Sequence, residues 1–302
     1  MSSHSQGSLF ASPQRDTRLR VGPAGWNYPD WTGTVYPAGA GPRFDHLGYL
    51  ADYFDTVEIN SSFYAPPKPA DAARWAARVR KNPRFRFTAK VWQRLTHERR
   101  DPADAGIEAD CETVRRSLGP VAEAGRLGAV LLQFPWRFRC VSENMAYLEL
   151  LFTRLRDWPL VLEVRHASWN EEQVFAFLRE WKVAFCNIDQ PVIGRSLRPG
   201  AVVTAPVGYF RLHGRNYENW FREDAGRDAR YDYLYSKEEI RELSGLIRQV
   251  REGASETYAI TNNHFRGQAL VNAIQILEEL DGVPPAVPPP VLAAHKMLGA
   301  GG

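Results

Sequence analysis

Short apolar segments alternate with amphipathic segments along most of the chain. The apolar segments are rich in Val, Ile, Leu and Phe, and they do not alternate cleanly between apolar and polar positions. Strands that are buried on both faces of a parallel sheet have this pattern. The pattern therefore predicts eight strands, at residues 19–24, 56–60, 85–90, 128–134, 160–164, 183–188, 207–212 and 257–261.

Amphipathic segments that predict helices lie between most of these strands, at residues 44–54, 69–79, 108–124, 142–155, 171–181, 236–250 and 267–280. One helix has a clear start signal, because Ser236 is followed three residues later by Glu239, the arrangement of a capping box. The link between the sixth and seventh strands differs from the others. Residues 190–206 contain three prolines and two glycines, so we expect a short helix or none there.

Strands that alternate with helices form a parallel sheet with right-handed crossovers. Eight such units in ~250 residues are the usual size of a closed barrel, so we predict an α/β fold, a single TIM-type (β/α)8 barrel with an irregular sixth-to-seventh unit. A doubly wound open sheet is the alternative, but no Gly-x-Gly-x-x-Gly follows the first strand. We expect a disordered N-terminal tail at 1–17, the barrel at 18–282 and a Pro/Gly-rich C-terminal tail at 283–302.

Composition adds few constraints to this picture. The net charge of +3 on 302 residues does not by itself indicate a nucleic-acid partner. No apolar run is long enough to predict a transmembrane helix, and residues 1–17 lack the apolar core of a secretory signal. The three cysteines have no metal-type spacing and are typical of reduced thiols, so we expect a cytoplasmic protein. Only six of the 38 cationic residues are lysines, which draws attention to Lys90 at the end of a predicted strand.

Polar side chains gather at the C-terminal ends of the predicted strands, where the chemistry of a TIM barrel lies. Side chains two residues apart point to the same side of a strand. We expect these pairs to face the barrel axis and to meet at its mouth, because an apolar interior tolerates polar groups only when they satisfy one another. The pairs are Glu58/Asn60, Glu163/Arg165, Asn187/Asp189 and Arg211/His213, and the remaining strand-end residues are Lys90, Gln133, Asn262 and Asn263.

Three chemistries fit these residues, beside a purely structural network of ion pairs. Four of them could bind a divalent cation or supply a general acid and base: Glu58, Glu163, Asp189 and His213. Four cationic residues could bind a phosphate or carboxylate: Lys90, Arg165, Arg211 and Arg215. Interleaved cations repel a metal ion and so disfavour a bare metal cage. No nucleotide-cofactor motif is present, and a divalent metal stays an open alternative.

Aromatic and basic residues add a second pattern on the same face. Six tryptophans fall in predicted strand-to-helix loops: Trp26, Trp31, Trp92, Trp136, Trp169 and Trp220. Such residues either anchor the loops by packing or stack on sugar rings or bases, and Trp26 and Tyr28 are the best candidates to line the mouth. Basic residues also crowd these loops, as solvated charges or as a rim that attracts a polyanion: Arg94, His97, Arg99, Arg100, Arg137, Arg139, Arg215 and Arg222.

Six short motifs in order resemble the YecE-like family, the domain of unknown function numbered 72. The first spans residues 22–37, with Gly25-Trp26-Asn27-Tyr28 at its centre. The others lie at residues 57–64, 132–135, 163–169, 209–215 and 262–273. The resemblance covers about residues 20–280. It implies a TIM-type barrel, but this family has no settled activity, so the resemblance supplies no reaction.

Departures from the family pattern are small. Ala24 stands where a hydroxyl residue is common, and Ser62 stands where Thr is usual. His264 follows the asparagine pair where a small polar residue is more usual, and could add a ligand or base.

Together these features favour an enzyme of hydrolase, isomerase or lyase type with a polar pocket at the strand ends. We expect its ligand to be small and anionic, such as a sugar phosphate or nucleotide. In this interpretation the expected substrate-binding residues are Trp26, Tyr28, Asn60, Lys90, Gln133, Arg165, Arg211 and Asn263. The alternatives are a nucleic-acid-binding or nuclease-like protein that uses the basic aromatic rim, and a non-catalytic binding scaffold.

Overall fold

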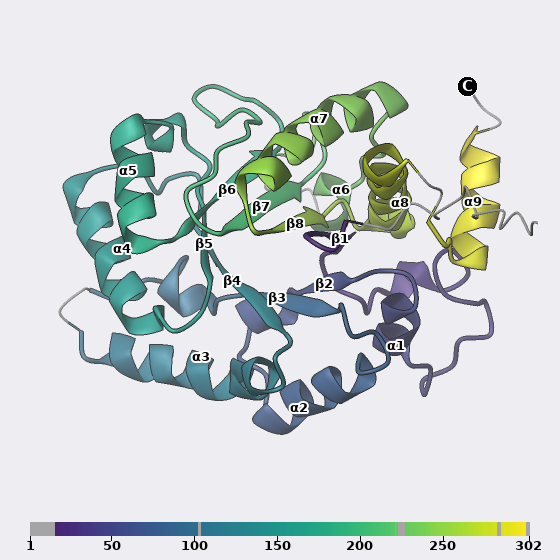
Figure 1. Cartoon of the computed structure of the whole chain (residues 1–302), viewed down its shortest axis with the longest axis horizontal. Helices are drawn as coiled ribbons and strands as arrows, with labels where there is room; N and C mark the ends of the chain where they lie inside the picture. The colour runs from purple at the N-terminus through teal and green to yellow at the C-terminus, as the bar shows by residue number, and fades with distance from the viewer. Residues whose placement is uncertain (1–15, 102–103, 221, 223–226, 283–284, 300–302) are drawn as a thin grey trace, which may run out of the picture.

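Eight parallel strands form the centre of the molecule. The computed structural model describes residues 16–101, 104–220, 222, 227–282 and 285–299. The strands are β1 (Leu19–Pro23), β2 (Thr56–Ile59), β3 (Arg86–Lys90), β4 (Leu127–Gln133), β5 (Leu160–Glu163), β6 (Ala184–Asp189), β7 (Val207–Leu212) and β8 (Glu256–Thr261). They lie in the order β1-β8-β7-β6-β5-β4-β3-β2, and helices surround them (Figure 1). The predicted TIM-type barrel is confirmed.

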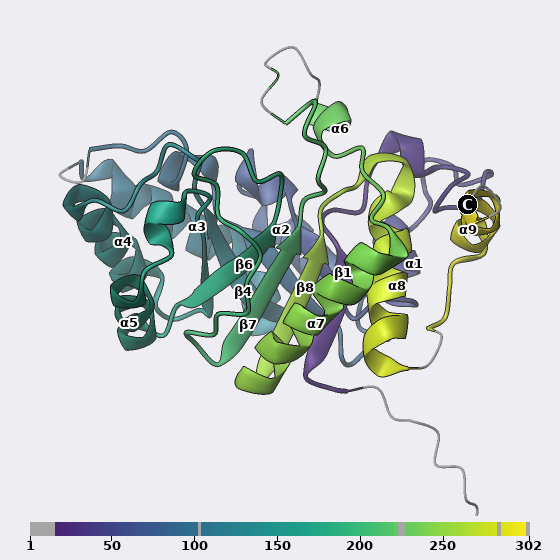
Figure 2. The same ribbon diagram turned by 90° about the horizontal axis from the view of Figure 1, so that it is seen from above.

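Helices follow seven of the strands close to the predicted positions. They are α1 (His46–Ala51), α2 (Pro69–Arg78), α3 (Gly106–Glu123), α4 (Ser142–Leu155), α5 (Glu172–Trp181), α7 (Lys237–Gly253) and α8 (Gln268–Asp281). The predicted capping box is present, since the Glu239 backbone N–H donates to Ser236 Oγ and the Ser236 N–H donates to Glu239 Oε2. Another short helix, α6 (Arg227–Arg230), stands out beyond the C-terminal ends of the strands (Figure 2).

The barrel closes where β1 meets β2. Ala24 forms an isolated parallel bridge with Glu58, and the Gly25 N–H donates to the Glu58 carbonyl at 2.9 Å. Lower in the barrel the strands approach closely because Gly22 has no side chain. A Cβ at this position would lie 2.0 Å from the Thr56 carbonyl oxygen, so any larger residue would push the two strands apart.

Strand register decides which side chains face the barrel axis. Residues paired across parallel strands point to the same face of the sheet. Glu58 pairs with Thr88, and Gln133 pairs with Glu163, so these four share the inner face. On the other side of the barrel, Arg211 pairs with Ile188 and with Ile260, and all three point inward.

This register corrects two of the predicted placements. Asp189 pairs with Leu212 and therefore lies on the outer face of β6, together with Asn187. Asn263 lies two residues after the outward-facing Thr261 and therefore also faces outward. Its neighbour Asn262 is the inward member of the asparagine pair. The prediction that Asn187 and Asp189 face the axis is wrong, because both faces of these strands are buried and the polar pattern alone cannot tell them apart. Asn263, a predicted substrate-binding residue, does not face the axis either.

The irregular link between β6 and β7 is confirmed. Residues 190–206 are all described, and no helix lies among them. The Asn187 side chain holds this link against the barrel, since its Nδ2 donates to the Val202 carbonyl at 2.9 Å and its Oδ1 accepts from the Val202 N–H at 2.8 Å. The outward direction of Asn187 therefore serves the fold, because the link covers a face that a helix covers elsewhere.

The C-terminal segment contains an element that the sequence pattern did not predict. Helix α9 (Pro289–Gly299) contacts α8, and Val291 is buried in that contact. The proline run suggested a loop, yet proline is compatible with the first turn of a helix because no backbone hydrogen bond is lost there. Residues 1–15, 283–284 and 300–302 of the predicted tails lie outside the described residues. Within the described ranges, every helix is too short or too polar to cross a membrane.

Candidate active site

A buried arginine joins two carboxylates inside the C-terminal end of the barrel. Arg211 Nη2 donates to Glu58 Oε1 at 2.7 Å, and its Nη1 donates to Glu163 Oε2 at 2.5 Å. The Arg211 side chain is 1% exposed and both glutamates are fully buried. Three strands, β2, β5 and β7, supply these groups, so the ion pairs form only when the barrel is closed. Charges this deep are stable only when each has a partner.

Glu163 has two further partners at the mouth. Its Oε1 accepts from Arg165 Nη2 at 2.8 Å and lies 3.2 Å from His213 Nε2. Burial alone would raise the pKa of Glu163, but Arg211, His213 and Arg165 hold that pKa well below its usual range. A carboxylate held ionised in this way is a poor general acid or base near neutral pH.

His213 is neutral in this environment. Burial lowers the pKa of His213 to about 3, in opposition to the nearby Glu163 carboxylate. Asn262 Nδ2 lies 3.0 Å from His213 Nδ1, so Nδ1 accepts and Nε2 carries the proton toward Glu163. His213 therefore acts as a hydrogen-bond donor that orients Glu163, and Asn262 fixes its tautomer.

Tyr209 is part of the same network, although the sequence prediction did not include it. Its hydroxyl lies 3.0 Å from Glu58 Oε2 and 2.8 Å from Thr88 Oγ1. The phenol can donate to the carboxylate while it accepts from the threonine. Tyr209 lies two residues before Arg211, so the alternation rule that selected the Arg211/His213 pair would have found it too.

Lys90 is the cation at this site without a carboxylate partner. Its Nζ lies 4.0 Å from the centre of the Phe63 ring, and none of the ion pairs in the described part of the chain involves it. The residue as a whole is half-buried. Burial lowers the pKa of Lys90 to about 7, with a further contribution from Arg211 and Arg165 that Glu58 and Glu163 oppose.

Gln133 places a buried carbonyl oxygen in the same region. Its side chain follows the inward face of β4 opposite Glu163, and the residue is 8% exposed. Its Oε1 is buried without a hydrogen-bond partner among the described residues. A buried carbonyl oxygen of this kind costs about 1–3 kcal/mol unless a ligand or water donates to it.

These residues form one group, which we call the mouth cluster: Glu58, Lys90, Gln133, Glu163, Arg165, Arg211 and His213. The cluster has two carboxylates against three cations when Lys90 is charged. The carboxylates are fully buried, whereas Arg165 retains 11% of its side-chain exposure and Lys90 is half-buried. A molecule that approaches the mouth therefore meets cations, with the carboxylates covered beneath them.

Asp189 belongs to a separate group outside the barrel, which we call the outer cluster: Asp189, Arg215, Tyr233, Tyr235 and Glu239. Arg215 Nη2 donates to Asp189 Oδ1 at 2.8 Å, and the Tyr235 hydroxyl donates to Asp189 Oδ2 at 2.6 Å. Arg215 Nη1 also donates to Glu239 Oε1 at 3.1 Å. Asp189 is thus bound within the fold, and the structure does not bring it to the mouth cluster.

Asn263 also has a role in the fold rather than a place at the mouth. Its Nδ2 donates to the Tyr233 carbonyl at 2.8 Å and to Asn272 Oδ1 at 2.7 Å. These bonds join the end of β8 to α8 and to the loop before α7.

Trp26, Tyr28 and Asn60 line a different hollow at the ends of β1 and β2. This aromatic pocket of about 420 Å3 also contacts Gly25, Asn27, Ser61, Tyr64 and Trp75. The Trp26 and Trp75 rings meet edge to face at 5.3 Å. Gly25 has a φ of +79°, and a Cβ there would lie 2.6 Å from the Tyr28 hydroxyl, so glycine lets the Tyr28 ring pack over the backbone. The turn Ser61–Phe63 separates this pocket from Lys90, because Phe63 lies under the lysine while Ser61 lines the pocket.

The other tryptophans of this face divide into two kinds. Trp31 and Trp169 are completely buried and donate to the carbonyls of His264 and Phe138, so they anchor loops. Trp220 is half-buried, and the Arg165 guanidinium lies 5.5 Å from its ring centre. Trp220 therefore covers one side of the mouth cluster.

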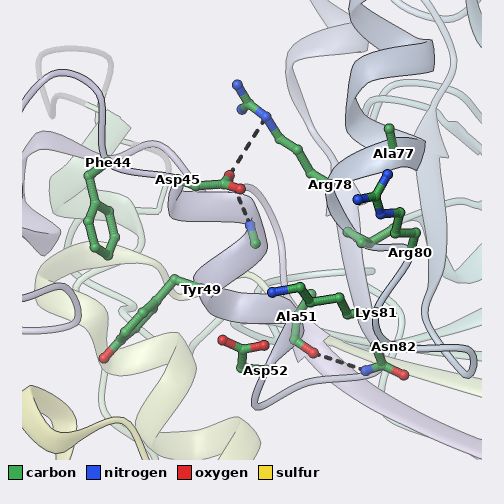
Figure 3. A pocket seen from close by; sticks show the side chains of 12 residues that line it. Phe44, Asp45, Tyr49, Ala51, Asp52, Ala77, Arg78, Arg80, Lys81 and Asn82 are labelled. Atoms are coloured by element: carbon green, nitrogen blue, oxygen red, sulfur yellow. Dashed lines mark hydrogen bonds and ion pairs between the residues drawn. The ribbon is translucent and has the colours of Figure 1, made fainter.

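A pocket of about 430 Å3 lies on the outside of the barrel, between α1 and the end of α2 (Figure 3). Asp45 contacts Arg78 at 3.7 Å, and Asn82 Nδ2 donates to the Ala51 carbonyl at 3.0 Å. Charges of both signs line it, and none of the predicted site residues does. It has the character of a solvated groove between two helices.

The basic rim is largely bound within the chain. Arg94 lies 3.3 Å from Asp110 and stacks on Trp92 at 4.6 Å. Arg100 pairs with Asp104 and with Asp110. Arg99 and Arg139 lie over aromatic rings. Carboxylates therefore neutralise Arg94 and Arg100, and cations paired in this way attract a polyanion less than free ones.

The four predicted metal ligands do not form a ligand set. Across the described ranges, no group of three or more His, Cys, Asp or Glu side chains is placed to hold a metal ion. Glu58 and Glu163 instead bind Arg211, and Asp189 lies on the other face of the sheet.

Comparison with known proteins gives a consistent result over nearly the whole chain. The family model described as "Protein of unknown function DUF72" matches residues 20–294 and so ends inside α9. The UPF0759 protein YunF of Bacillus subtilis (strain 168) is 30% identical over 276 residues, which cover 87% of this chain and 95% of YunF.

Two solved structures are similar in fold and sequence. A DUF72 family protein from Thermotoga maritima MSB8 is 35% identical, with a TM-score of 0.76 and coverage of 87% of this chain and 99% of that chain. A DUF72 family protein from Enterococcus faecalis V583 is 29% identical, with a TM-score of 0.77 and coverage of 87% and 95%. None of these names states a reaction.

Proposed function

This chain belongs to the DUF72 family of proteins of unknown function, and we propose that it is an enzyme that acts on a small anionic molecule at the mouth of the barrel. The observation that carries the proposal is the layering of charge in the mouth cluster. Arg165 and Lys90 are accessible, whereas Glu58 and Glu163 are buried and paired. A carboxylate or phosphate at the mouth would balance the extra positive charge.

Each part of the mouth has a role in this proposal. Arg165 binds the anionic group, because Gln190 and Glu163 hold its guanidinium in place at 3.0 and 2.8 Å. Gln133 Oε1 accepts a hydrogen bond from a substrate hydroxyl or amine. Glu58 and Glu163 act through Arg211 and Arg165 as positioning residues.

A small substrate suits this site better than a nucleic acid. The rim arginines already bind Asp104, Asp110 and aromatic rings, whereas the extra cation lies inside the mouth, where a duplex backbone does not reach. Nucleic-acid binding would instead need exposed cations along a surface path.

Thermal unfolding in the presence of small anions tests the proposal. Phosphate and glyoxylate should stabilise the protein by about 1.4 kcal/mol at ten times Kd. Arg165→Gln should remove this effect, and Arg94→Gln, which changes a rim arginine on the same face, should retain it. Depletion of phosphorylated sugars and oxo acids, followed by proton NMR, would show turnover. An equal response of both variants to the anions would contradict the proposal.

A further inference from the structure

Lys90 has the surroundings of a nucleophilic lysine rather than of an anion-binding one. A lysine that only binds anions keeps its charge and is usually well hydrated. Lys90 instead ends a barrel strand with its amine 4.0 Å from the Phe63 ring centre and without a carboxylate partner of its own among the described residues. Two arginines stand nearby, and the two carboxylates that could neutralise the amine are already bound to Arg211.

Resting on the proposed anion site, we propose that the Lys90 amine forms an imine with the carbonyl group of a small aldehyde or ketone that also carries a carboxylate or phosphate. Arg165 would hold the anionic group while the carbonyl carbon meets Lys90 Nζ. A lysine becomes nucleophilic when it is desolvated or lies next to other cations. Lys90 lies against the Phe63 ring in the same cluster as Arg165 and Arg211, which already bind both carboxylates.

The bond changes balance within the site. The Lys90 nitrogen lone pair attacks the carbonyl carbon, and the C–O π electrons move to oxygen to give a carbinolamine after proton transfer from nitrogen to oxygen. The oxygen then leaves as water with the second nitrogen proton, and the C=N bond forms. Protonation of the imine gives an iminium, which accepts electrons from an adjacent C–C or C–H bond. The class of reaction is therefore a lyase or isomerase step next to a carbonyl.

The same surroundings suit the product of this step. An iminium is a cation, and the Phe63 ring face and the carboxylates of Glu58 and Glu163 stabilise positive charge at this position. Burial, Arg211 and Arg165 oppose them and lower the pKa of Lys90 to about 7, so part of the lysine is the free amine near neutral pH. The titratable groups that act on the amine are Glu58, His97, Glu163, Arg165 and Arg211, and His97 is neutral near pH 7 because its pKa is lowered to about 4, mainly by burial.

Reductive trapping of the full-length protein tests this inference. Glyoxylate carries an aldehyde and a carboxylate, and cyanoborohydride would deliver hydride to the imine carbon while the nitrogen takes a proton from water. The expected result is a carboxymethyl group on Lys90, formed at pH 7 at least about tenfold faster than on an exposed lysine. Peptide mapping provides internal controls in the same chain, because Lys68, Lys81, Lys182 and Lys237 are exposed to solvent.

Matched variants and probes separate this inference from the proposed function. Lys90→Met should lose the adduct, and Lys81→Met should retain it. Acetaldehyde, which lacks the carboxylate, should label Lys90 more slowly than glyoxylate does. If glyoxylate stabilises the protein but labels Lys90 no faster than the exposed lysines, the imine is wrong and the anion site stands. If Lys90 is labelled equally by both aldehydes and no anion stabilises the protein, the proposed function fails and the anionic class of substrate fails with it.

Discussion

The mouth cluster and the outer cluster are built from the same kinds of residue, yet they handle charge differently. Each has an arginine between two carboxylates: Arg211 between Glu58 and Glu163, and Arg215 between Asp189 and Glu239. In the outer cluster the extra charge is the carboxylate of Glu239. That carboxylate sits in the first turn of α7, accepts the Ser236 N–H and is partly exposed, so the helix end and water stabilise it.

The extra charge of the mouth cluster is held differently. It is the half-buried Lys90 ammonium, which lies over the Phe63 ring and forms no ion pair among the described residues. The fold thus satisfies the outer cluster by itself, whereas the proposed anionic ligand, or loss of the Lys90 proton, would balance the charge of the mouth cluster. This difference separates a group that stabilises the fold from a candidate site of chemistry, although both begin as polar residues at strand ends.

Removal of Arg211 should have the largest effect. Arg211→Met leaves two fully buried carboxylates without their shared partner, and should lower the free energy of unfolding by about 3–5 kcal/mol or prevent folding. The triple variant Arg211→Met, Glu58→Gln, Glu163→Gln removes the stranded charges and should recover much of the loss. Urea denaturation measures both. A single variant as stable as the parent would show that these ion pairs do not stabilise the mouth.

Neutralisation of the outer cluster should have an intermediate effect on stability and none on the mouth. Asp189→Asn leaves Arg215 with Glu239, so we expect a loss of about 1–3 kcal/mol in the free energy of unfolding. Stabilisation by phosphate or glyoxylate should be unchanged. Loss of anion binding in this variant would mean that the two clusters act together.

Lys90→Met should change stability by an amount that depends on pH. The pKa of Lys90 is lowered from 10.5 to about 7 in the folded protein, so between these values the unfolded chain holds a proton that the folded one has released. The free energy of unfolding of the parent should therefore rise relative to Lys90→Met as pH increases from 7 toward 10, by at most about 1.4 kcal/mol per pH unit.

The opposite pH range supplies the control for Lys90. Below pH 7 both states of the parent hold the proton, so the full cost of the buried charge remains and the difference between the proteins should be constant. Urea titrations at several pH values measure it. A difference that stays flat from pH 6 to 10 would show that Lys90 keeps its proton in the folded protein.

Substitution on the rim should have the smallest effect. Arg94→Gln removes a partly exposed ion pair with Asp110 and should change the free energy of unfolding by less than about 1 kcal/mol. We also expect no retention of duplex DNA on a filter at low salt by the parent. Retention that weakens steeply with salt and is lost in Arg94→Gln would place the function on the rim instead of the mouth.

The candidate site was only partly predictable from sequence. Glu58, Glu163 and Arg211 were found because pairs of polar residues two apart on a strand share a face, and this held for β2, β5 and β7. Asp189 was misplaced although its pairing with Asn187 is the same kind of signal. Tyr209 and Gln190 were missed, the first because a tyrosine in an apolar strand indicates packing, and the second because it lies past the end of β6.

Local periodicity and local hydrogen bonds were enough to predict the barrel, the positions of its strands and helices, and the capping box at Ser236. They did not predict α9, whose burial depends on contact with α8. Which face of β6 and β8 turns inward depends on how the whole barrel packs, since a strand buried on both sides has no polar face to mark the outside. Tertiary packing also sets the state of Lys90, because the charges that act on that amine come from strands far apart in the chain and meet only when the barrel closes.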